Sequence, residues 1–385
     1  MLDLRTIYIV SAMTCSVLGI VQMIAYSSGR FERWLFWWSA SGIVIGAGLF
    51  SVGLRNVLPD VVSVLIGNNL ILVGYLLLIV SVRLFGGRPA RWGLSWLILA
   101  VLSAPLILLW RDDASTAPRI AIFSLVCALG DLLVMLEGIR LARQEKLRSA
   151  WLVAAIYLPT AAIFAARALL AVTGWIGEGG LFGPGNGADA WLGLWAAPFL
   201  ALRSIVINLM AAERAGNKLT YLADRDALTG VLNRGGLMRS YAGLEPGPVA
   251  LMLIDVDRFK QLNDTHGHGV GDEVLRRFAS SASLHLRSHD LFARQGGDEF
   301  VIVLKGCPVE KAVETAQKIR AAFAASLAEM EGLVVQPTLS IGVATEICGP
   351  GDLETLLQRA DLALYARKRN GRDGIDTFEE DRQAA

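Results

Sequence analysis

The stretch Arg294-Gln295-Gly296-Gly297-Asp298-Glu299-Phe300, followed by the apolar residues 301–304, decides how the C-terminal half of this chain folds. Two adjacent glycines between strand-like segments predict a β-hairpin whose tip presents two consecutive carboxylates. Such a tip can bring backbone amides close to a phosphate and hold a divalent cation beside it. A Gly-Gly-Asp turn is also common as a plain turn, so its function depends on the rest of the sequence.

The composition divides the 385 residues into two halves. The chain is 54% hydrophobic with a net charge of +1, which is too apolar for a soluble protein of this length. All ten tryptophans precede residue 196, and all four histidines follow residue 260. We therefore predict a membrane domain over residues 1–210, a helical linker over residues 211–225 and a soluble domain over residues 226–385.

The N-terminal half contains apolar stretches of about twenty residues, the length that crosses a bilayer. They predict an all-α domain of seven transmembrane helices at residues 7–26, 34–54, 61–82, 92–110, 120–139, 151–172 and 190–210. From Ile205 onward, apolar residues spaced by seven predict a helix that could pair two copies of the chain as a short coiled coil.

The distribution of basic residues between the predicted spans indicates the orientation. Odd-numbered loops hold Arg30, Arg33, Arg83, Arg88, Arg91, Arg140, Arg143, Lys146 and Arg148, whereas even-numbered loops hold only Arg55, Arg111 and Arg119. The positive-inside bias then places the N-terminus outside and the C-terminal half in the cytoplasm. We expect a multi-pass membrane protein.

Polar side chains inside the predicted spans are candidates for a site within the membrane, because charge is costly there. They are Asn68, Asn69, Asp131, Arg167 and Arg203. Asp131 and Arg167 lie on neighbouring antiparallel spans and are predicted to pair. The alternative is that these groups only hydrogen-bond helices to one another.

The C-terminal half alternates buried strands with amphipathic helices. Strands are predicted at residues 249–255, 290–294, 300–304, 338–343 and 375–378, and helices at residues 272–286, 309–325 and 353–368. The order βαββαβ predicts an α/β (α+β) domain with a ferredoxin-like core, in which helices cover one face of an antiparallel sheet. Asp255 ends the first of these strands, where it can hold a metal beside a phosphate, cap a helix or lie on the surface.

Several spaced motifs of this half resemble those of the GGDEF domain, the nucleotide-cyclase-like catalytic domain of diguanylate cyclases. The resemblance covers about residues 222–378. Its motifs are residues 226–234, residues 255–260, Asn263 with Asp272, residues 296–300, residues 340–343, and Lys368 with residues 371–372. It implies a homodimer in which each domain holds one GTP, and the two GTP are joined into cyclic di-GMP with release of two pyrophosphates.

The resemblance also implies two Mg²⁺ or Mn²⁺ ions in each active site. Asp255, Asp298 and the Val256 carbonyl match metal-binding positions. Glu299 matches either a ligand of the second metal or a group beside the attacking hydroxyl, and both roles stay open. One metal would polarise the α-phosphate and the other would steady the leaving pyrophosphate. Asp255, Asp298 and Glu299 are therefore the predicted catalytic residues.

The implied GTP pocket combines cations for the phosphates with polar groups for the base. Its predicted residues are Phe259, Lys260, Asn263, Asp272, Gly296, Gly297, Lys368 and Arg372. The cations match the positions that hold the β- and γ-phosphates, although Lys368 and Arg372 could also form a solvated helix end. Asp272 can accept from guanine N1–H and the exocyclic amine, and would repel the acceptor N1 of adenine. Asp373 departs from the family, which commonly has Asn there.

Arg287 and Asp290, just before the hairpin, resemble the family's inhibitory site for cyclic di-GMP. Lys318 matches a second basic contact there. A surface ion pair is the alternative interpretation of Arg287 and Asp290.

Two other classes of function fit parts of the sequence. A non-catalytic receptor for cyclic di-GMP or GTP would be favoured if Lys260, Asp298 or Glu299 were altered, and all three are present. A transporter would be favoured by inverted repeats or paired broken helices, which the sequence does not show. The sequence therefore favours a membrane-bound diguanylate cyclase. Its expected partners are GTP, cyclic di-GMP, a second copy of the chain and the lipid bilayer, with no nucleic acid.

Overall fold

The computed structural model describes residues 3–379, except residues 30, 111–115, 177–180, 182–186, 331 and 349–352. Two of the basic residues used for the predicted orientation, Arg30 and Arg111, lie outside the described residues. The chain forms two compact units, Met1–Gly216 and Asn217–Ala385.

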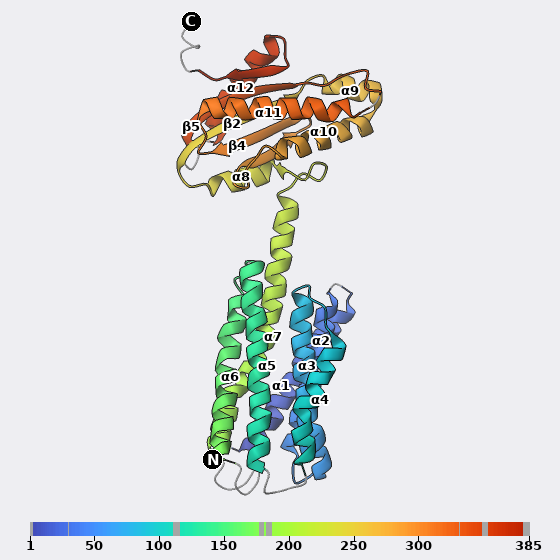
Figure 1. Ribbon diagram of the computed structural model, residues 1–385, viewed down its shortest axis with the longest axis vertical. Helices are drawn as coiled ribbons and strands as arrows, with labels where there is room; N and C mark the ends of the chain where they lie inside the picture. The colour runs from blue at the N-terminus through green and yellow to red at the C-terminus, as the bar shows by residue number, and fades with distance from the viewer. Residues whose placement is uncertain are drawn as a thin grey trace. The chain divides into compact units, whose positions relative to one another are not determined.

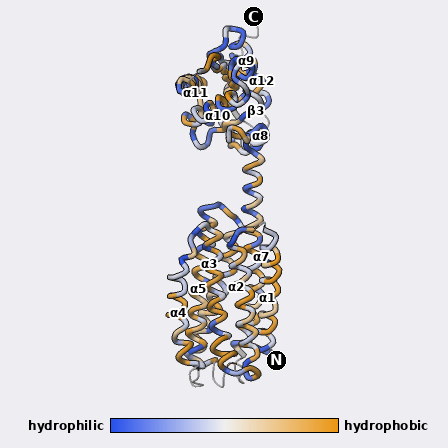
Figure 2. The backbone as a smooth tube through the Cα atoms, turned by 90° about the vertical axis from the view of Figure 1, so that its right-hand side faces the viewer, coloured by the Kyte–Doolittle hydropathy of each residue, from blue (hydrophilic) through white to orange (hydrophobic). Residues whose placement is uncertain are grey.

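The N-terminal unit is a bundle of apolar helices (Figure 1, Figure 2). They are α1 (Leu4–Ser27), α2 (Arg33–Gly53), the π-helical η1 (Val61–Ile66) continuing into α3 (Gly67–Phe85), α4 (Trp92–Leu108), α5 (Thr116–Gln144), α6 (Ala150–Val172) and α7 (Gly187–Ala223). Among the described residues, six helices are long and apolar enough to cross a membrane, and α4 is a shorter apolar helix of 17 residues. The predicted count of seven spans therefore stays a prediction.

Glycines allow α1, α2 and α3 to pack closely. A methyl group on Gly19 of α1 would lie 2.9 Å from the Ser39 carbonyl of α2. One on Gly48 of α2 would lie 2.8 Å from the Gly67 carbonyl of α3. Small residues at such positions bring helix backbones together, as they do in membrane bundles.

Two buried ion pairs connect α7 to α5 and α6. Arg203 donates to Asp131 at 2.9 Å, and Arg167 donates to Asp189 at 2.5 Å. The predicted pair between Asp131 and Arg167 is therefore wrong. Asp131 lies 15 residues from the start of α5, whereas Arg167 lies 5 residues from the end of α6, at the same end of the bundle. At about 1.5 Å per residue, their depths differ by about 15 Å.

The described part of the C-terminal unit contains a mixed sheet of six strands in the order β1-β3-β4-β2-β5-β6. The strands are β1 (Leu232–Asn233), β2 (Gly247–Val256), β3 (Leu291–Gly296), β4 (Glu299–Lys305), β5 (Leu339–Cys348) and β6 (Gly374–Thr377). The helices are α8 (Arg234–Ala242), α9 (Phe259–His266), α10 (His268–Ser283), α11 (Val309–Ala328) and α12 (Leu353–Arg369). The four central strands β3, β4, β2 and β5 pair antiparallel with one another. The outer strands β1 and β6 pair parallel with β3 and β5.

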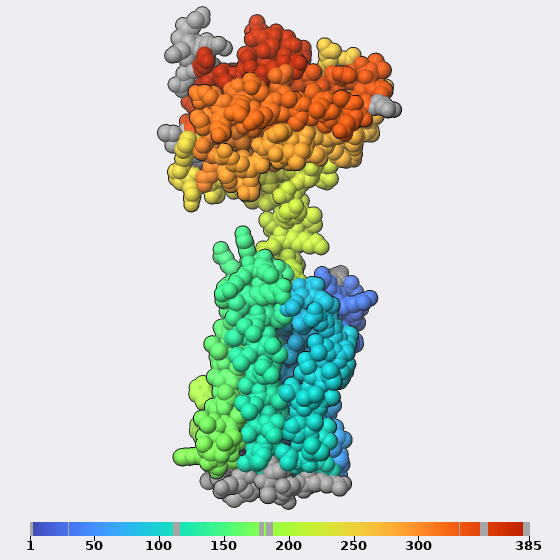
Figure 3. Space-filling model, in the orientation of Figure 1, coloured from blue at the N-terminus to red at the C-terminus, as the bar shows by residue number. Residues whose placement is uncertain are grey.

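Helices cover both faces of this sheet, which corrects the prediction of one covered face. Phe278 of α10 and Phe323 of α11 pack on one face, and Figure 3 shows α11 in orange on the surface. Leu237 of α8 and Leu356 of α12 belong to the core on the other face. Residues 249–256 of β2 are buried at every position, so both faces of the central strand need an apolar cover.

Candidate active site

The glycine-rich turn joins β3 to β4 as the sequence predicts. Gly296 pairs with Glu299, and the register shifts between Arg294 and Gly296. Gly297 has φ +50°, in the left-handed region that glycine adopts without a Cβ penalty. Nothing lies within 4 Å of a methyl group placed on Gly296 or Gly297, so the tip is open to an approaching ligand.

Three acidic residues meet where the central strands end. Asp255 of β2 pairs directly with Glu299 of β4, and the Val256 N–H donates to the Asp298 carbonyl at 3.3 Å. Burial and the neighbouring Asp255 raise the pKa of both Asp298 and Glu299 above the ordinary values. Crowded carboxylates of this kind are stabilised by a cation, and oxygen ligands suit Mg²⁺.

Lys368 supplies a positive charge to this acidic site. Its ammonium group at the end of α12 lies 2.7 Å from Asp255 Oδ2. Among the described residues, no three His, Cys, Asp or Glu side chains form a ready-made metal site. The predicted phosphate ligand Lys368 therefore contacts a predicted metal ligand in this structure.

Asp257, which sequence reasoning assigned no role, fixes the loop after α12. It is 2% exposed and accepts from Thr338 Oγ1 at 2.7 Å, Ser340 Oγ at 2.8 Å and the Asp373 N–H at 3.1 Å. Arg372 and Asp373 both have positive φ, which this anchor helps to hold. Arg372 Nε lies 3.9 Å from Asp257, with its side chain half exposed. In the sequence, the only local feature that could have pointed to a role for Asp257 is its position two residues after Asp255.

Asp373, the departure from the family, accepts a hydrogen bond from Arg320 of α11 at 2.6 Å. Its carboxylate is thus paired with a cation other than Arg372, its neighbour in the chain.

The predicted base-reading residues lie on the consecutive helices α9 and α10. Asn263 Oδ1 is buried and has no hydrogen-bond partner among the described residues. A methyl group on Gly271, next to Asp272, would overlap this oxygen, so the glycine leaves room for it. Phe259 packs partly against the core, and Lys260 is exposed in the first turn of α9.

Arg294 joins the hairpin to the start of the domain, a role that sequence reasoning also missed. Its Nε and Nη2 donate to the Gly297 carbonyl at 2.9 and 2.7 Å, and its Nη1 donates to Asp226 Oδ1 at 3.1 Å. Burial alone would raise the pKa of the Asp226 carboxyl. Hydrogen bonds from Thr229 and Arg294 outweigh it, so this pKa lies below its ordinary value. A contact between residues 68 positions apart has no local pattern in the sequence.

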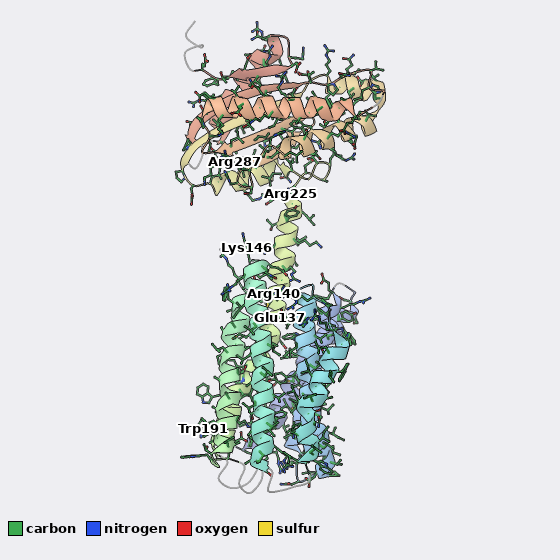
Figure 4. All side chains as sticks on the ribbon, in the orientation of Figure 1. Glu137, Arg140, Lys146, Trp191, Arg225 and Arg287 are labelled. Carbon is green, nitrogen blue, oxygen red and sulfur yellow. The ribbon has the colours of Figure 1, made fainter. Side chains whose placement is uncertain are left out.

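Of the three predicted inhibitory residues, Arg287 and Asp290 lie in one turn, and Lys318 lies on α11. Asp290 accepts from the Arg287 N–H at 2.8 Å and from the Lys305 N–H at 3.3 Å. The Arg287 side chain is exposed (Figure 4). Lys318 donates to Glu314 on its own helix at 2.6 Å.

This α/β domain has acidic groups at adjacent strand ends and a lysine against them. It also has a buried amide oxygen without a described partner. Residues 223–374 match the family described as diguanylate cyclase, GGDEF domain. The C-terminal domain of this chain therefore belongs to the GGDEF family, which confirms the resemblance seen in the sequence.

Named relatives share this domain. The chain is 39% identical over 160 residues to the diguanylate cyclase DosC of Escherichia coli K12, covering 40% of this chain and 35% of DosC. It is 38% identical over 180 residues to the diguanylate cyclase DgcM of the same strain, covering 44% and 42%. The crystal structure of the coiled coil and GGDEF domain of DgcB from Caulobacter crescentus with c-di-GMP matches with TM-score 0.40 and 28% identity, over 46% of this chain and 96% of that one. The chain thus spans less than half the length of these two curated relatives.

Proposed function

We propose that this protein is a diguanylate cyclase, which joins two GTP into cyclic di-GMP and releases two pyrophosphates. The observation that carries the proposal is the convergence of Asp255, Asp298 and Glu299 at the ends of β2 and β4, in a domain of the GGDEF family. In each of two steps a ribose 3′-oxygen forms a bond to the α-phosphorus of the other nucleotide. The bond from that phosphorus to pyrophosphate breaks, and the hydroxyl proton is lost.

The acidic groups fit two Mg²⁺ or Mn²⁺ ions, because burial and mutual repulsion already raise the pKa of Asp298 and Glu299. Asp255, Asp298, Glu299 and the Val256 carbonyl would hold them. When bound, the ions would polarise the α-phosphate and balance the charge of the pyrophosphate. We infer that Lys368 then leaves Asp255 and turns to the phosphates, where Lys260 and Arg372 also bind.

Guanine selection is assigned to Asn263 and Asp272. The buried, unpaired Asn263 Oδ1 would accept from a base N–H, and its orphaned state in the structure supports this assignment. Asp272 would accept from guanine and disfavour adenine. Arg287, Asp290 and Lys318 are proposed to bind the product at an inhibitory site.

Because one domain holds one GTP, the reaction needs two copies of the chain. We propose a homodimer in the bacterial inner membrane, with the N-terminus outside and the GGDEF domain in the cytoplasm. The six helices of membrane-spanning length among the described residues support the membrane location. The membrane domain would regulate how often two GGDEF domains meet.

The test is turnover of GTP with Mg²⁺ by the full-length protein in detergent, with products separated by chromatography. The wild type is expected to form cyclic di-GMP, whereas Asp298→Ala should lose at least about a hundredfold in rate because a metal-binding carboxylate is gone. Glu329→Gln, a change at an exposed residue of the same unit, serves as the matched control and should stay within about twofold. Unchanged activity in a folded Asp298→Ala variant would refute the assigned site. Tight GTP binding without product would favour the receptor.

A further inference from the structure

The N-terminal unit contains a partly open cavity of about 140 Å³ among α1, α2, α3, α5, α6 and α7. Leu4 in the first turn of α1, Arg55 just after α2 and Thr116 at the start of α5 line it. These residues place one side of the cavity at the end of the bundle where the N-terminus lies (Figure 1). An engineered apolar cavity of about 150 Å³ binds benzene, so this space suits a small organic molecule.

Arg203 of α7 lines this cavity and has one buried donor without a described partner. The residue is 6% exposed, and its Nη2 donates to Asp131 at 2.9 Å and to Thr160 at 3.3 Å. Its Nε is buried and has no hydrogen-bond partner in the part of the chain that the structure describes. Buried donors are nearly always paired, because desolvation without a partner is costly. The unpaired Nε–H therefore indicates a missing acceptor.

The charges around the cavity favour an anion. Arg203 is balanced by Asp131, and Arg167 is balanced by Asp189 through hydrogen bonds of 2.5 and 3.1 Å. Arg55 and Arg119 also line the cavity, and Asp189 is the one acidic residue among its described lining residues. The described lining therefore carries more positive than negative charge.

We propose that this cavity binds a small carboxylate with an apolar body of about the size of benzene. The carboxylate would accept from Arg203 Nε–H, and the apolar body would lie among side chains that include Ile45, Ile71, Phe123 and Leu200. Ligand pockets commonly combine such apolar walls with a few placed polar groups. Inorganic phosphate and acetate have no apolar body to fill the space, so they should bind poorly.

The position of Arg203 connects this site to the rest of the chain. Arg203 lies on α7, and the same helix continues to Ala223, three residues before Asp226. A ligand held by Arg203 therefore contacts the element that enters the C-terminal unit. Such a site can shift a conformational equilibrium only if its ligand prefers one state.

Benzoate is the probe, and binding is measured by equilibrium dialysis with the full-length protein in nanodiscs of neutral lipid, without nucleotide. We expect saturable binding of one benzoate per chain with a Kd below about 1 mM. Cyclohexanecarboxylate should compete, and acetate, phosphate and benzamide should not. Absence of saturable binding would overturn the proposal, as would equal competition by acetate or by neutral benzamide. Because no GTP is present, this result is independent of the diguanylate cyclase proposal.

Variants test the location of the site. Ala197→Leu and Leu200→Phe add volume to residues that line the cavity, and each should raise the Kd for benzoate at least about tenfold. Arg203→Lys keeps the charge beside Asp131 but removes the Nε–H, and should weaken binding similarly. Leu202→Phe, at an exposed position of the same helix, is the matched control and should leave the Kd within about twofold. Unchanged affinity in both folded cavity variants would contradict the assignment.

Discussion

At the scale of single residues, the site depends on side chains that hold other parts of it in place. Thr338 and Ser340 hold Asp257, which accepts from the Asp373 N–H and so fixes the Arg372 loop. Arg294 fixes the hairpin through the Gly297 carbonyl. Neither residue belongs to the predicted set of metal or phosphate ligands. Both would act by positioning the groups that do contact the substrate.

Arg294→Gln tests this positioning. The change removes the hydrogen bonds to Gly297 and the ion pair with Asp226, so the hairpin tip should lose its defined position. We expect turnover to fall about ten- to hundredfold, because small misplacement of reacting groups is costly. The measurement is kcat of the full-length protein with GTP. Arg239→Gln removes the exposed ion pair with Asp224 and is the matched control. Equal activity of the two variants would show that Arg294 has no positioning role.

At the scale of elements, α12 and β5 place Lys368 beside Asp255. Gly342 of β5 packs directly against the backbone of α12, where a methyl group would overlap the Ala360 carbonyl and the Leu364 nitrogen. Backbone atoms of a helix cannot move aside one at a time. A larger residue at position 342 must therefore shift the whole helix.

Gly342→Ala is expected to separate α12 from β5 and to draw Lys368 away from Asp255. Overpacking of this kind costs about 1–3 kcal/mol, so hydrogen exchange of β5 and α12 amides should accelerate and turnover should fall. Gly247→Ala at the start of β2 is the control, because a methyl group there meets nothing within 4 Å. Unaltered exchange and turnover in Gly342→Ala would contradict the close packing.

Local patterns predicted much of the C-terminal unit. The apolar residues 249–254 and the Gly296-Gly297 turn indicated β2 and the hairpin, since both signals lie within a few residues. Long-range pairings were missed: Arg294 with Asp226 and Asp257 with Thr338 join distant segments. The Asp131 partner was misassigned because the sequence does not show how helix ends align. The continuous apolar run of β2 fits a strand that is covered on both faces. The βαββαβ order nevertheless led to the prediction that helices cover only one face.

At the scale of the whole molecule, α7 belongs to both units, because the boundary at Gly216 falls inside this helix. It carries Arg203 within the bundle and ends just before Asp226, which contacts Arg294 of the hairpin. The helix α7 thus continues from the N-terminal unit into the C-terminal unit. If the proposed regulation by the N-terminal unit occurs, we expect it to act through this helix.

The central claim is that the protein joins two GTP molecules. The most direct measurement incubates the full-length protein with Mg²⁺ and equal amounts of unlabelled and fully ¹³C,¹⁵N-labelled GTP, followed by mass spectrometry of the products. The account predicts cyclic di-GMP in three mass forms, with the mixed form twice as abundant as either pure form, and two pyrophosphates per product. A folded protein that leaves GTP unchanged, or consumes it without forming cyclic di-GMP, would contradict the account.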